Sequence, residues 1–227
     1  RLNEPTDLVI LPEMFSTGFT MDLASCAEEM DGITAKRLVE WARDRDADIA
    51  GSMAIKEKGR YYNRLLWARP GGAIITYDKR HLFRMAGEEK VYTAGNAKIV
   101  IELKGWKIRP FICYDLRFPV WSRNKGLEYD IALYVANWPE KRAAHWRALL
   151  RARAIENQCY CIGVNRVGTD GNGVSHCGDS AVIDYQGSII FEKGNEECAA
   201  TIALSYEKMA EYRRAFPAWK DADEFTL

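Results

Sequence analysis

Residues 107–119 read Lys-Ile-Arg-Pro-Phe-Ile-Cys-Tyr-Asp-Leu-Arg-Phe-Pro, an apolar strand followed by a turn that leads toward a helix. Cys113 lies at the end of that strand. A thiol in this position can receive hydrogen bonds from free backbone N–H groups and faces the positive end of the helix dipole. Both effects lower the pKa of a thiol and prepare a pocket for an oxyanion. We therefore predict that Cys113 is a nucleophile, and the alternative is a buried structural cysteine.

Two other apolar stretches end in a charged residue. Leu8-Val-Ile-Leu-Pro-Glu13 ends in a glutamate, and Ile74-Ile-Thr-Tyr-Asp-Lys79 ends in a lysine. Sheets of α/β proteins present their site residues at the ends of strands. Each charge alone could be a solvated strand end, but Glu, Lys and Cys at three strand ends predict one shared site.

The base that activates Cys113 could be a carboxylate such as Glu13, or a histidine, His81 or His145, as in papain-like enzymes. The sequence has no G-x-S-x-G, Walker A, H-E-x-x-H or paired C-x-x-C motif. The glycine-rich residues 168–173 do not open a helix, so we predict a hairpin turn there and no phosphate cradle. Scattered histidines and cysteines predict no metal site and no cofactor.

The remaining pattern predicts an α/β protein of two mixed sheets with helices outside. Helical spacing predicts helices over 34–45, 141–157 and 205–216, the last capped by Ser205 and stopped by Pro217, and a short one after Pro119. Turn sequences at 70–72 and 184–187 predict hairpins, which argue against a purely parallel sheet. Short apolar runs predict eleven strands, over 8–11, 49–53, 61–67, 73–77, 98–103, 107–113, 131–136, 160–164, 179–183, 187–191 and 199–204.

Composition limits the class of protein. The 227 residues predict one domain, 1–227, and 48% hydrophobic with 28% charged residues excludes wholesale disorder. Equal counts of 32 basic and 32 acidic residues give no reason to expect nucleic acid or an anionic membrane as partner. The apolar runs are too short to span a membrane, so we expect a soluble protein. Six cysteines without a short-spaced framework predict free thiols and a cytoplasmic location, with Cys159, Cys161 and Cys198 as packed strand residues.

Three motifs strongly resemble the nitrilase, or carbon–nitrogen hydrolase, superfamily. They are Leu-Pro-Glu13-Met-Phe, Tyr-Asp-Lys79-Arg-His-Leu-Phe and Ile-Cys113-Tyr-Asp-Leu-Arg-Phe-Pro, and they are accompanied by Ala-Asn-Trp-Pro at 136–139 and Ala-Arg-Ala-Ile-Glu-Asn-Gln at 152–158. The resemblance implies an αββα sandwich, a Glu13–Lys79–Cys113 triad and a homodimer. It also implies a second glutamate between the lysine and the cysteine. Glu88 matches it best, and Glu89 is the alternative.

Within the superfamily, residues 79–84, the Asn-Trp-Pro motif and the C-terminal tail look most like the bacterial ω-amidases, which hydrolyse 2-oxoglutaramate and 2-oxosuccinamate. This resemblance implies a small-molecule amide substrate. Another carbon–nitrogen hydrolase, such as a nitrilase or an N-carbamoyl amidohydrolase, and a non-catalytic scaffolding member of the fold are the alternatives. Members of the family open with a strand and a helix, which residues 1–7 do not contain. Either the sequence is truncated or one sheet has lost a strand.

The resemblance also suggests roles for residues around the triad. Tyr114 and Trp138 are expected to line the pocket, and the backbone N–H of Tyr114 is expected to help Lys79 hold the oxyanion. Asp115 and Arg117 are expected to form a structural ion pair. A substrate carboxylate needs a cationic anchor, for which arginine offers two parallel hydrogen bonds. Arg142 is our choice for this anchor, with Arg84 and Arg166 as the other candidates.

Overall fold

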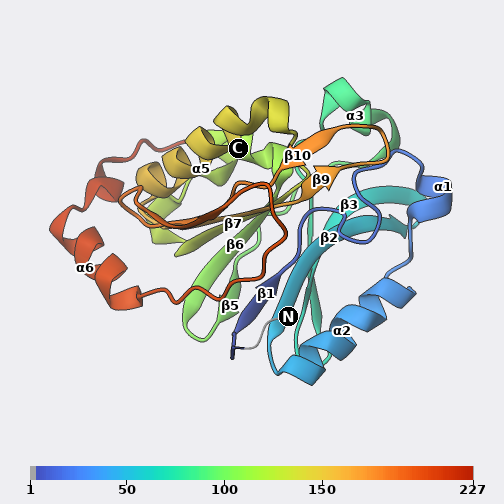
Figure 1. Ribbon diagram of the computed structural model, residues 1–227. Helices are drawn as coiled ribbons and strands as arrows, with labels where there is room; N and C mark the ends of the chain where they lie inside the picture. The colour runs from blue at the N-terminus through green and yellow to red at the C-terminus, as the bar shows by residue number, and fades with distance from the viewer. Residues whose placement is uncertain (1–3, 227) are drawn as a thin grey trace.

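Two β-sheets lie face to face in the computed structural model, which describes residues 4–226 (Figure 1). The first sheet has the order β1 (Leu8–Ile10), β2 (Asp48–Glu57), β3 (Arg60–Ala68) and β4 (Ile74–Asp78). The second has the order β12 (Ile189–Lys193), β11 (Ser180–Ile183), β8 (Tyr160–Asn165), β7 (Ile131–Ala136), β6 (Trp106–Ile112) and β5 (Ile101–Leu103). Both sheets mix parallel and antiparallel pairs, because short hairpins join some neighbours and longer crossovers join the others.

Helices cover the outer faces of both sheets. Helix α2 (Ile33–Arg45) packs on β2 and β3 through Ala35, Leu38 and Ala42, a spacing that puts all three on one face. Helix α5 (Ala143–Asn157) packs on β8 and β11. Helix α6 (Tyr206–Ala215) begins after Ser205, whose hydroxyl accepts a hydrogen bond from the backbone N–H of Lys208. The predicted αββα arrangement is confirmed. The shorter helical elements are α1 (Leu23–Cys26), η1 (Arg84–Ala86), α3 (Glu88–Val91), η2 (Cys113–Arg117), α4 (Pro119–Ser122), η3 (Lys125–Leu127), η4 (Glu140–Arg142) and η5 (Ala218–Asp221).

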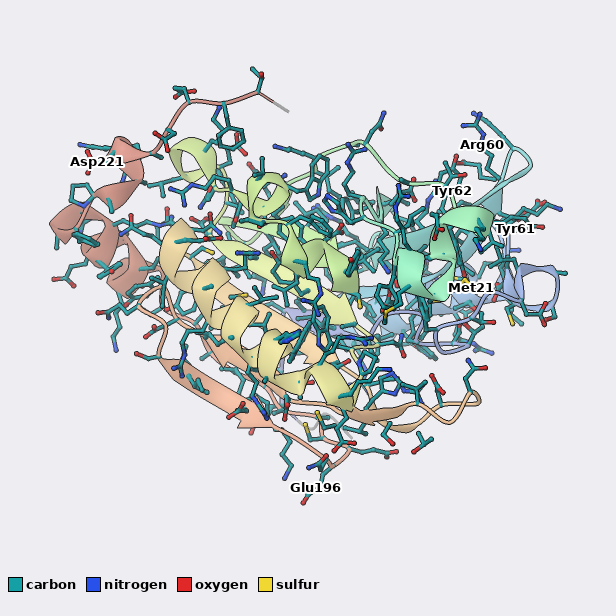
Figure 2. The ribbon with its side chains drawn as sticks, turned by 90° about the horizontal axis from the view of Figure 1, so that it is seen from above. Met21, Arg60, Tyr61, Tyr62, Glu196 and Asp221 are labelled. Carbon is teal, nitrogen blue, oxygen red and sulfur yellow. The ribbon has the colours of Figure 1, made fainter. Side chains whose placement is uncertain are left out.

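The main apolar core lies between the sheets and contains fully buried side chains from both, such as Leu65 and Phe111. Such close packing fixes the position of each strand relative to its neighbours. A smaller apolar cluster, with Met21 and Tyr61 at its edge, flanks the strand ends of the first sheet. In the view from above, Met21 and Tyr61 lie at one side of the molecule and Asp221 lies at the opposite end (Figure 2).

Parallel pairing brings distant parts of the chain to one edge of the second sheet. Strands β6, β7 and β8 run in the same direction, with Ile112 opposite Val135 and Ala136 opposite Asn165. The segments that follow β6 and β7 therefore emerge side by side. As a result, Cys113 after β6 and Asn137 after β7 reach the same region.

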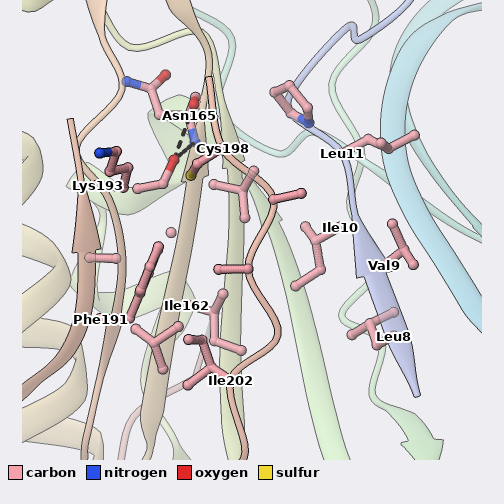
Figure 3. A pocket seen from close by; sticks show the side chains of 18 of the residues that line it. Leu8, Val9, Ile10, Leu11, Ile162, Asn165, Phe191, Lys193, Cys198 and Ile202 are labelled. Carbon is pink, nitrogen blue, oxygen red and sulfur yellow. Dashed lines mark hydrogen bonds between the residues drawn. The ribbon is translucent and has the colours of Figure 1, made fainter. Parts of the chain in front are cut away.

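Most predicted elements are confirmed, but the strand over 199–204 is wrong. These residues run without strand pairing, and a cavity of about 1050 Å³ separates them from β1 (Figure 3). Strand β1 pairs with β2 alone among the described strands, so neither segment has a neighbour on the cavity side. An extended segment becomes a strand only when a neighbouring backbone completes its hydrogen bonds. Cys198, expected to be a packed strand residue, is exposed instead, whereas Cys159 and Cys161 are buried.

The hairpin predicted from residues 168–173 is confirmed. It joins β9 (Val167–Thr169) to β10 (Ser175–Cys177), and the Asp170 carboxylate accepts hydrogen bonds from the backbone N–H groups of Asn172 and Val174 within the turn.

Within residues 4–226, no helix is long and apolar enough to cross a membrane. Residues 1–3 lie outside the described residues. The expectation that the first strand and helix of the family are missing therefore stays a prediction. The single domain over 1–227 also stays a prediction.

Candidate active site

Glu13, Lys79, Glu88 and Cys113 come together between the two sheets at their strand ends. Lys79 Nζ donates to Glu13 Oε1 at 2.9 Å and to both carboxylate oxygens of Glu88 at 3.0 Å. Glu13, Lys79 and Glu88 are all at least 99% buried. Buried charges persist only when they are paired and hydrogen-bonded, and one ammonium between two carboxylates meets this need. The structure thus places in one cluster the three strand-end residues named from the sequence.

The carboxylate of Glu13 is held on both oxygens. Asn63 Nδ2 donates to Oε1 at 2.8 Å, and the backbone N–H of Asn137 donates to Oε2 at 2.8 Å. Asn63 is itself fixed, because its Oδ1 accepts a hydrogen bond from Ser52 Oγ at 2.9 Å. These bonds hold Glu13 in one orientation at the cavity that Cys113 also lines, where its charge acts on the thiol.

Glu88, rather than Glu89, is the second glutamate of the cluster. Its Oε2 also accepts the backbone N–H of Phe83, and its Oε1 accepts Asn63 Nδ2 at 3.3 Å. Glu89 is only partly buried, and its Oε2 has no hydrogen-bond partner among residues 4–226. Glu88 is absent from the described lining of the cavity beside Cys113, so its contacts are those of a residue that positions Lys79.

Cys113 starts the five-residue turn η2 with φ of 44°, in the left-handed region that residues other than glycine rarely adopt. The pKa of this thiol is raised well above its ordinary value by burial and by the charge of Glu13, while Lys79 acts in the opposite direction. The expectation of a lowered pKa was therefore wrong. A single 3-10 turn carries little dipole, and the negative charge of Glu13 affects the thiol pKa more than the positive charge of Lys79 does.

The charges of Lys79 and Glu88 are coupled. Burial alone would lower the pKa of Lys79, but the charges of Glu13 and Glu88 outweigh it and raise that pKa well above the ordinary value. Burial raises the pKa of Glu88, although Lys79 partly offsets the effect. Lys79 is therefore an ammonium at neutral pH, at the cavity that Cys113 also lines.

Asp115 does not form the predicted ion pair with Arg117. Its buried carboxylate accepts four hydrogen bonds instead, from Tyr77 Oη at 2.8 Å, the backbone N–H of Ile112 at 3.1 Å, and the backbone N–H and Nδ1 of His81 at 2.9 and 2.8 Å. Tyr77 and His81 lie on either side of Lys79 in the sequence, and Ile112 precedes Cys113. The Asp115 carboxylate therefore links the residues around Lys79 to the backbone just before Cys113 by hydrogen bonds.

A cavity of about 320 Å³ opens beside the cluster. Tyr114 and Trp138 line it, as expected, and Tyr114 packs against Phe83 with ring centroids 5.1 Å apart. Trp138 donates its indole N–H to the carbonyl of Arg142 at 2.8 Å. The full lining is Glu13, Phe19, Met21, Lys79, Phe83, Met85, Ala86, Cys113, Tyr114, Arg117, Asn137, Trp138, Pro139, Lys141, Arg142, Asp170, Asn172, Val174 and His176. Glu13, Lys79 and Cys113 thus meet a space large enough for a small molecule.

Two guanidinium groups belong to this lining, those of Arg117 and Arg142. The Arg117 guanidinium lies 4.7 Å from the ring centre of Trp138 and has no carboxylate partner within the described chain. Burial and the charge of Arg117 lower the pKa of Arg142. Two neighbouring cations without a protein anion make this end of the cavity suited to an anionic group.

The other sequence candidates lie elsewhere. Arg84 is exposed, and Arg166 lines the larger cavity of Figure 3. The ring of His81 is engaged by Asp115, and His145 is exposed, with Nδ1 3.1 Å from Arg117 Nη2. Neither histidine belongs to the described lining of the cavity beside Cys113, whereas Glu13 does.

The larger cavity shares Glu13 and Asn137 with the smaller one, but its described lining includes neither Lys79 nor Cys113. Cys198 and Lys193 belong to that lining, but Lys79, which is bonded to Glu13 and Glu88, lines only the smaller cavity among those described. Within the described chain, no group of three or more His, Cys, Asp or Glu residues could hold a metal ion.

Sequence reasoning missed Asn63, the amide contact of Asn137, and the cavity position of Arg117. Asn137 lies in the quoted Asn-Trp-Pro motif, which offered a signal. Asn63 lies within a strand of alternating pattern, where nothing marks a polar inward-facing residue. Its role depends on β2 and β3 pairing, which brings it beside Glu13.

Comparison with known proteins agrees with this geometry. The sequence profile of the carbon–nitrogen hydrolase family matches residues 2–214. The chain belongs to the carbon–nitrogen hydrolase family. It is 52% identical to "Omega-amidase YafV" of Escherichia coli strain K12, over 97% of this chain and 86% of that protein, and 36% identical to "2-oxoglutaramate amidase" of Bacillus subtilis, over 95% and 84%.

A solved member of this carbon–nitrogen hydrolase family has the same fold. It is XC1258 of Xanthomonas campestris, described as carrying an arsenic adduct in its active site, with a TM-score of 0.96 and 48% identity over 97% of this chain and 86% of that one. The yeast protein Nit3 aligns with a TM-score of 0.83 at 25% identity, over 93% of this chain and 81% of that one. The agreement extends over nearly all of this chain.

Proposed function

We propose that this carbon–nitrogen hydrolase is an ω-amidase, which hydrolyses the terminal amide of a 2-oxoacid amide such as 2-oxoglutaramate or 2-oxosuccinamate. The products are the 2-oxo-dicarboxylate and ammonia. The observation that carries the proposal is the buried Lys79 between Glu13 and Glu88, at a cavity that is also lined by Cys113 and by two guanidinium groups without a carboxylate partner among the described residues. The names of the relatives from Escherichia coli and Bacillus subtilis point to the same substrate class.

The first half of the reaction forms a thioester. Glu13 accepts the proton of the Cys113 thiol as the sulfur attacks the amide carbonyl carbon, and the carbonyl oxygen takes the negative charge. Because burial keeps the thiol protonated at rest, this transfer must accompany the attack. Collapse of the tetrahedral intermediate breaks the C–N bond, and Glu13 returns the proton to the leaving nitrogen, which departs as ammonia.

The second half releases the acid. Glu13, again a carboxylate, accepts a proton from water as the water oxygen attacks the thioester carbon. Collapse of the second intermediate breaks the C–S bond, and the proton on Glu13 passes to the sulfur. The acid leaves and the Cys113 thiol is restored, so that the whole cycle consumes one water and yields one ammonia.

Lys79 and the backbone N–H of Tyr114 stabilise both oxyanions in this mechanism. A fixed ammonium in a site that excludes water stabilises developing negative charge strongly, and removing one such donor costs roughly 10²–10³ in rate. Glu88 holds this ammonium in place and compensates its charge in the resting enzyme.

Arg142, the anchor chosen from the sequence, and Arg117 bind the substrate carboxylate in this proposal. Both line the cavity, and neither pairs with a carboxylate of the described chain. A carboxylate between two guanidinium groups gains several charge-assisted hydrogen bonds. Tyr114 and Trp138 enclose the aliphatic middle of the substrate.

The test is ammonia release by the purified protein from a panel of amides, nitriles and carbamoyl compounds. We expect 2-oxoglutaramate to be the best substrate and glutamine to be at least about a hundredfold poorer in kcat/KM, since its α-ammonium would face the two arginines. Asp170 lines the same cavity and is the one carboxylate of the described lining, apart from Glu13, that could meet that ammonium.

The control is Cys113→Ala, which should abolish turnover of every compound, while Cys198→Ala changes an exposed thiol and should not. Preference for a nitrile or a carbamoyl amino acid would replace the proposed substrate class and leave the mechanism standing. Turnover of no compound in the panel would favour a scaffolding member. We further propose a homodimer located in the cytoplasm, and light scattering tests the first of these.

A further inference from the structure

One side of the cavity beside Cys113 is formed by the hairpin of β9 and β10. In Figure 1 this hairpin reaches across the strand ends toward α3. His176 lies on β10, opposite Gly168 of β9, and its side chain lines the cavity. The residue is 5% exposed, so it is part of the wall of the cavity and not of the outer surface.

The imidazole of His176 has hydrogen-bonding capacity that the described chain leaves unused. Nδ1 is buried without a partner among residues 4–226. The carbonyls of Gly168 and Val174 lie near the ring, but neither has hydrogen-bond geometry with Nδ1. Nδ1 has almost no accessible surface, so a ligand in the cavity would meet Nε2, the ring nitrogen that is not enclosed and has no hydrogen-bond partner among residues 4–226.

The ring is also kept neutral. Burial and the positive charge of Arg166 lower the pKa of His176, against smaller effects of Asp170 and the nearby carbonyls. A neutral imidazole has one N–H donor and one acceptor nitrogen. It can therefore donate to a carbonyl oxygen without adding a positive charge to the cavity that Arg117 and Arg142 also line.

Strand β10, which carries His176, lies next to the turn where the substrate carboxylate is proposed to bind. Strand β10 packs against η4, the turn that ends at Arg142. In a 2-oxoacid amide, the 2-oxo carbon is bonded directly to the carboxylate that Arg142 and Arg117 are proposed to bind. A hydrogen-bond donor on β10, next to that turn, is therefore on the side of the cavity where the 2-oxo oxygen would lie.

We propose that His176 donates a ring N–H hydrogen bond to the 2-oxo oxygen of the substrate and so selects 2-oxoacid amides over amides that lack this group. The inference rests on the proposed ω-amidase function and identifies the residue that recognises the 2-oxo group. His176 contacts substrate away from the reacting atoms, so its effect appears in substrate preference.

The test compares 2-oxoglutaramate with glutaramate, the same molecule with a methylene in place of the 2-oxo group. We expect wild type to prefer 2-oxoglutaramate at least tenfold in kcat/KM. In His176→Phe, which keeps a flat ring but has no donor, kcat/KM for 2-oxoglutaramate should fall roughly 10–100-fold, the scale of a lost buried hydrogen bond, while the value for glutaramate changes little. His176→Gln retains an N–H donor and should recover part of the preference. Ser175→Ala, on the exposed side of the same strand, is the matched control.

Each outcome separates the two proposals. If wild type turns over neither compound, the proposed function fails. If wild type turns over both with less than threefold preference, or if His176→Phe and His176→Leu retain the wild-type ratio, the role of His176 is overturned and the amidase function stands. An equal loss on both compounds would also overturn it, because it would indicate a structural role or recognition of the carboxylate. If the Phe variant does not fold, as seen by circular dichroism, the Leu and Gln variants decide by the same ratio.

Discussion

At the scale of single residues, the proposed chemistry depends on three buried side chains and the partly buried Cys113, which together hold two negative charges, one positive charge and one neutral thiol. Lys79 is bonded to both Glu13 and Glu88, and Glu13 is also the neighbour of Cys113. In the proposed mechanism, the Glu13 carboxylate accepts the thiol proton during attack, and before the attack its negative charge keeps the thiol protonated. This arrangement keeps the nucleophile unreactive until a substrate carbonyl is positioned beside Lys79.

Glu13→Gln tests this double role. Loss of the negative charge should lower the pKa of Cys113, because that charge raises it in the wild type. Alkylation of Cys113 by iodoacetamide at pH 7 should therefore become faster, while amide turnover should fall by at least about 10²-fold for want of the base. The measurement is mass-spectrometric labelling of Cys113 against pH. A labelling rate that falls together with turnover would show that Glu13 does not raise the thiol pKa.

Lys79→Arg keeps a positive charge but replaces a compact ammonium by a planar guanidinium. The space between Glu13 and Glu88 is filled, so the larger group should displace both carboxylates from Cys113. We expect a loss in kcat of at least ~10²-fold, the scale of a lost oxyanion donor. Lys141→Arg, an exposed lysine at the cavity rim, is the control. Activity of Lys79→Arg within tenfold of wild type would exclude a direct role of the ammonium.

At the scale of elements, the site is assembled by segments that follow β1, β4, β6 and β7, and the carboxylate of Asp115 links two of them. It accepts hydrogen bonds from residues on both sides of Lys79 and from the residue before Cys113. Tyr77 extends the network, because its hydroxyl accepts the indole N–H of Trp121 at 3.0 Å. The strained backbone of Cys113 is thus supported by bonds outside its own turn.

Asp115→Asn should disturb this link while filling the same volume. An amide N–H₂ cannot accept the hydrogen bonds that Oδ2 accepts from Tyr77 and Ile112, so a cost of ~1–3 kcal/mol in stability is expected. We expect kcat to fall roughly tenfold or more, with KM changed less than threefold, because the cavity wall at the arginine end is untouched. Steady-state kinetics with a thermal melt measures both effects.

The matched control for Asp115→Asn is Asp130→Asn. Asp130 is equally buried and bonded, to Arg213 Nη1 at 2.7 Å, but it lies away from the cavity lining. It should lower the melting temperature and leave kcat unchanged. If both variants reduce kcat in proportion to their loss of stability, Asp115 has no specific role in positioning the site.

At the scale of the whole molecule, one apolar cluster lies between the two sheets and another lies between the first sheet and helix α2. Strand β3 contributes side chains to both clusters. Leu65 and Leu66 are neighbours on β3, yet Leu65 faces the core between the sheets and Leu66 faces helix α2. This alternation makes β3 part of both layers. Loosening either layer should therefore weaken the whole fold.

Leu65→Ala and Leu38→Ala test that coupling from the two layers. Both side chains are fully buried, so each variant should lose about 2–5 kcal/mol of the free energy of unfolding. We expect one cooperative urea transition in each case, with tryptophan fluorescence and circular dichroism giving the same midpoint. Separate transitions for the two signals would show that the layers unfold independently and would contradict a single domain over 1–227.

The sequence by itself determined the strand ends that carry Glu13, Lys79 and Cys113, the hairpins at 70–72, 168–173 and 184–187, and the αββα layers implied by the family motifs. These features are local, because hydrophobic period, turn residues and motif letters lie within short stretches of chain. Only the tertiary structure decided the pKa of Cys113, the choice of Glu88, the partners of Asp115 and the cavity position of Arg117 and His176. Each of these depends on which distant side chains become neighbours and how much water they exclude, and strand pairing and burial set both.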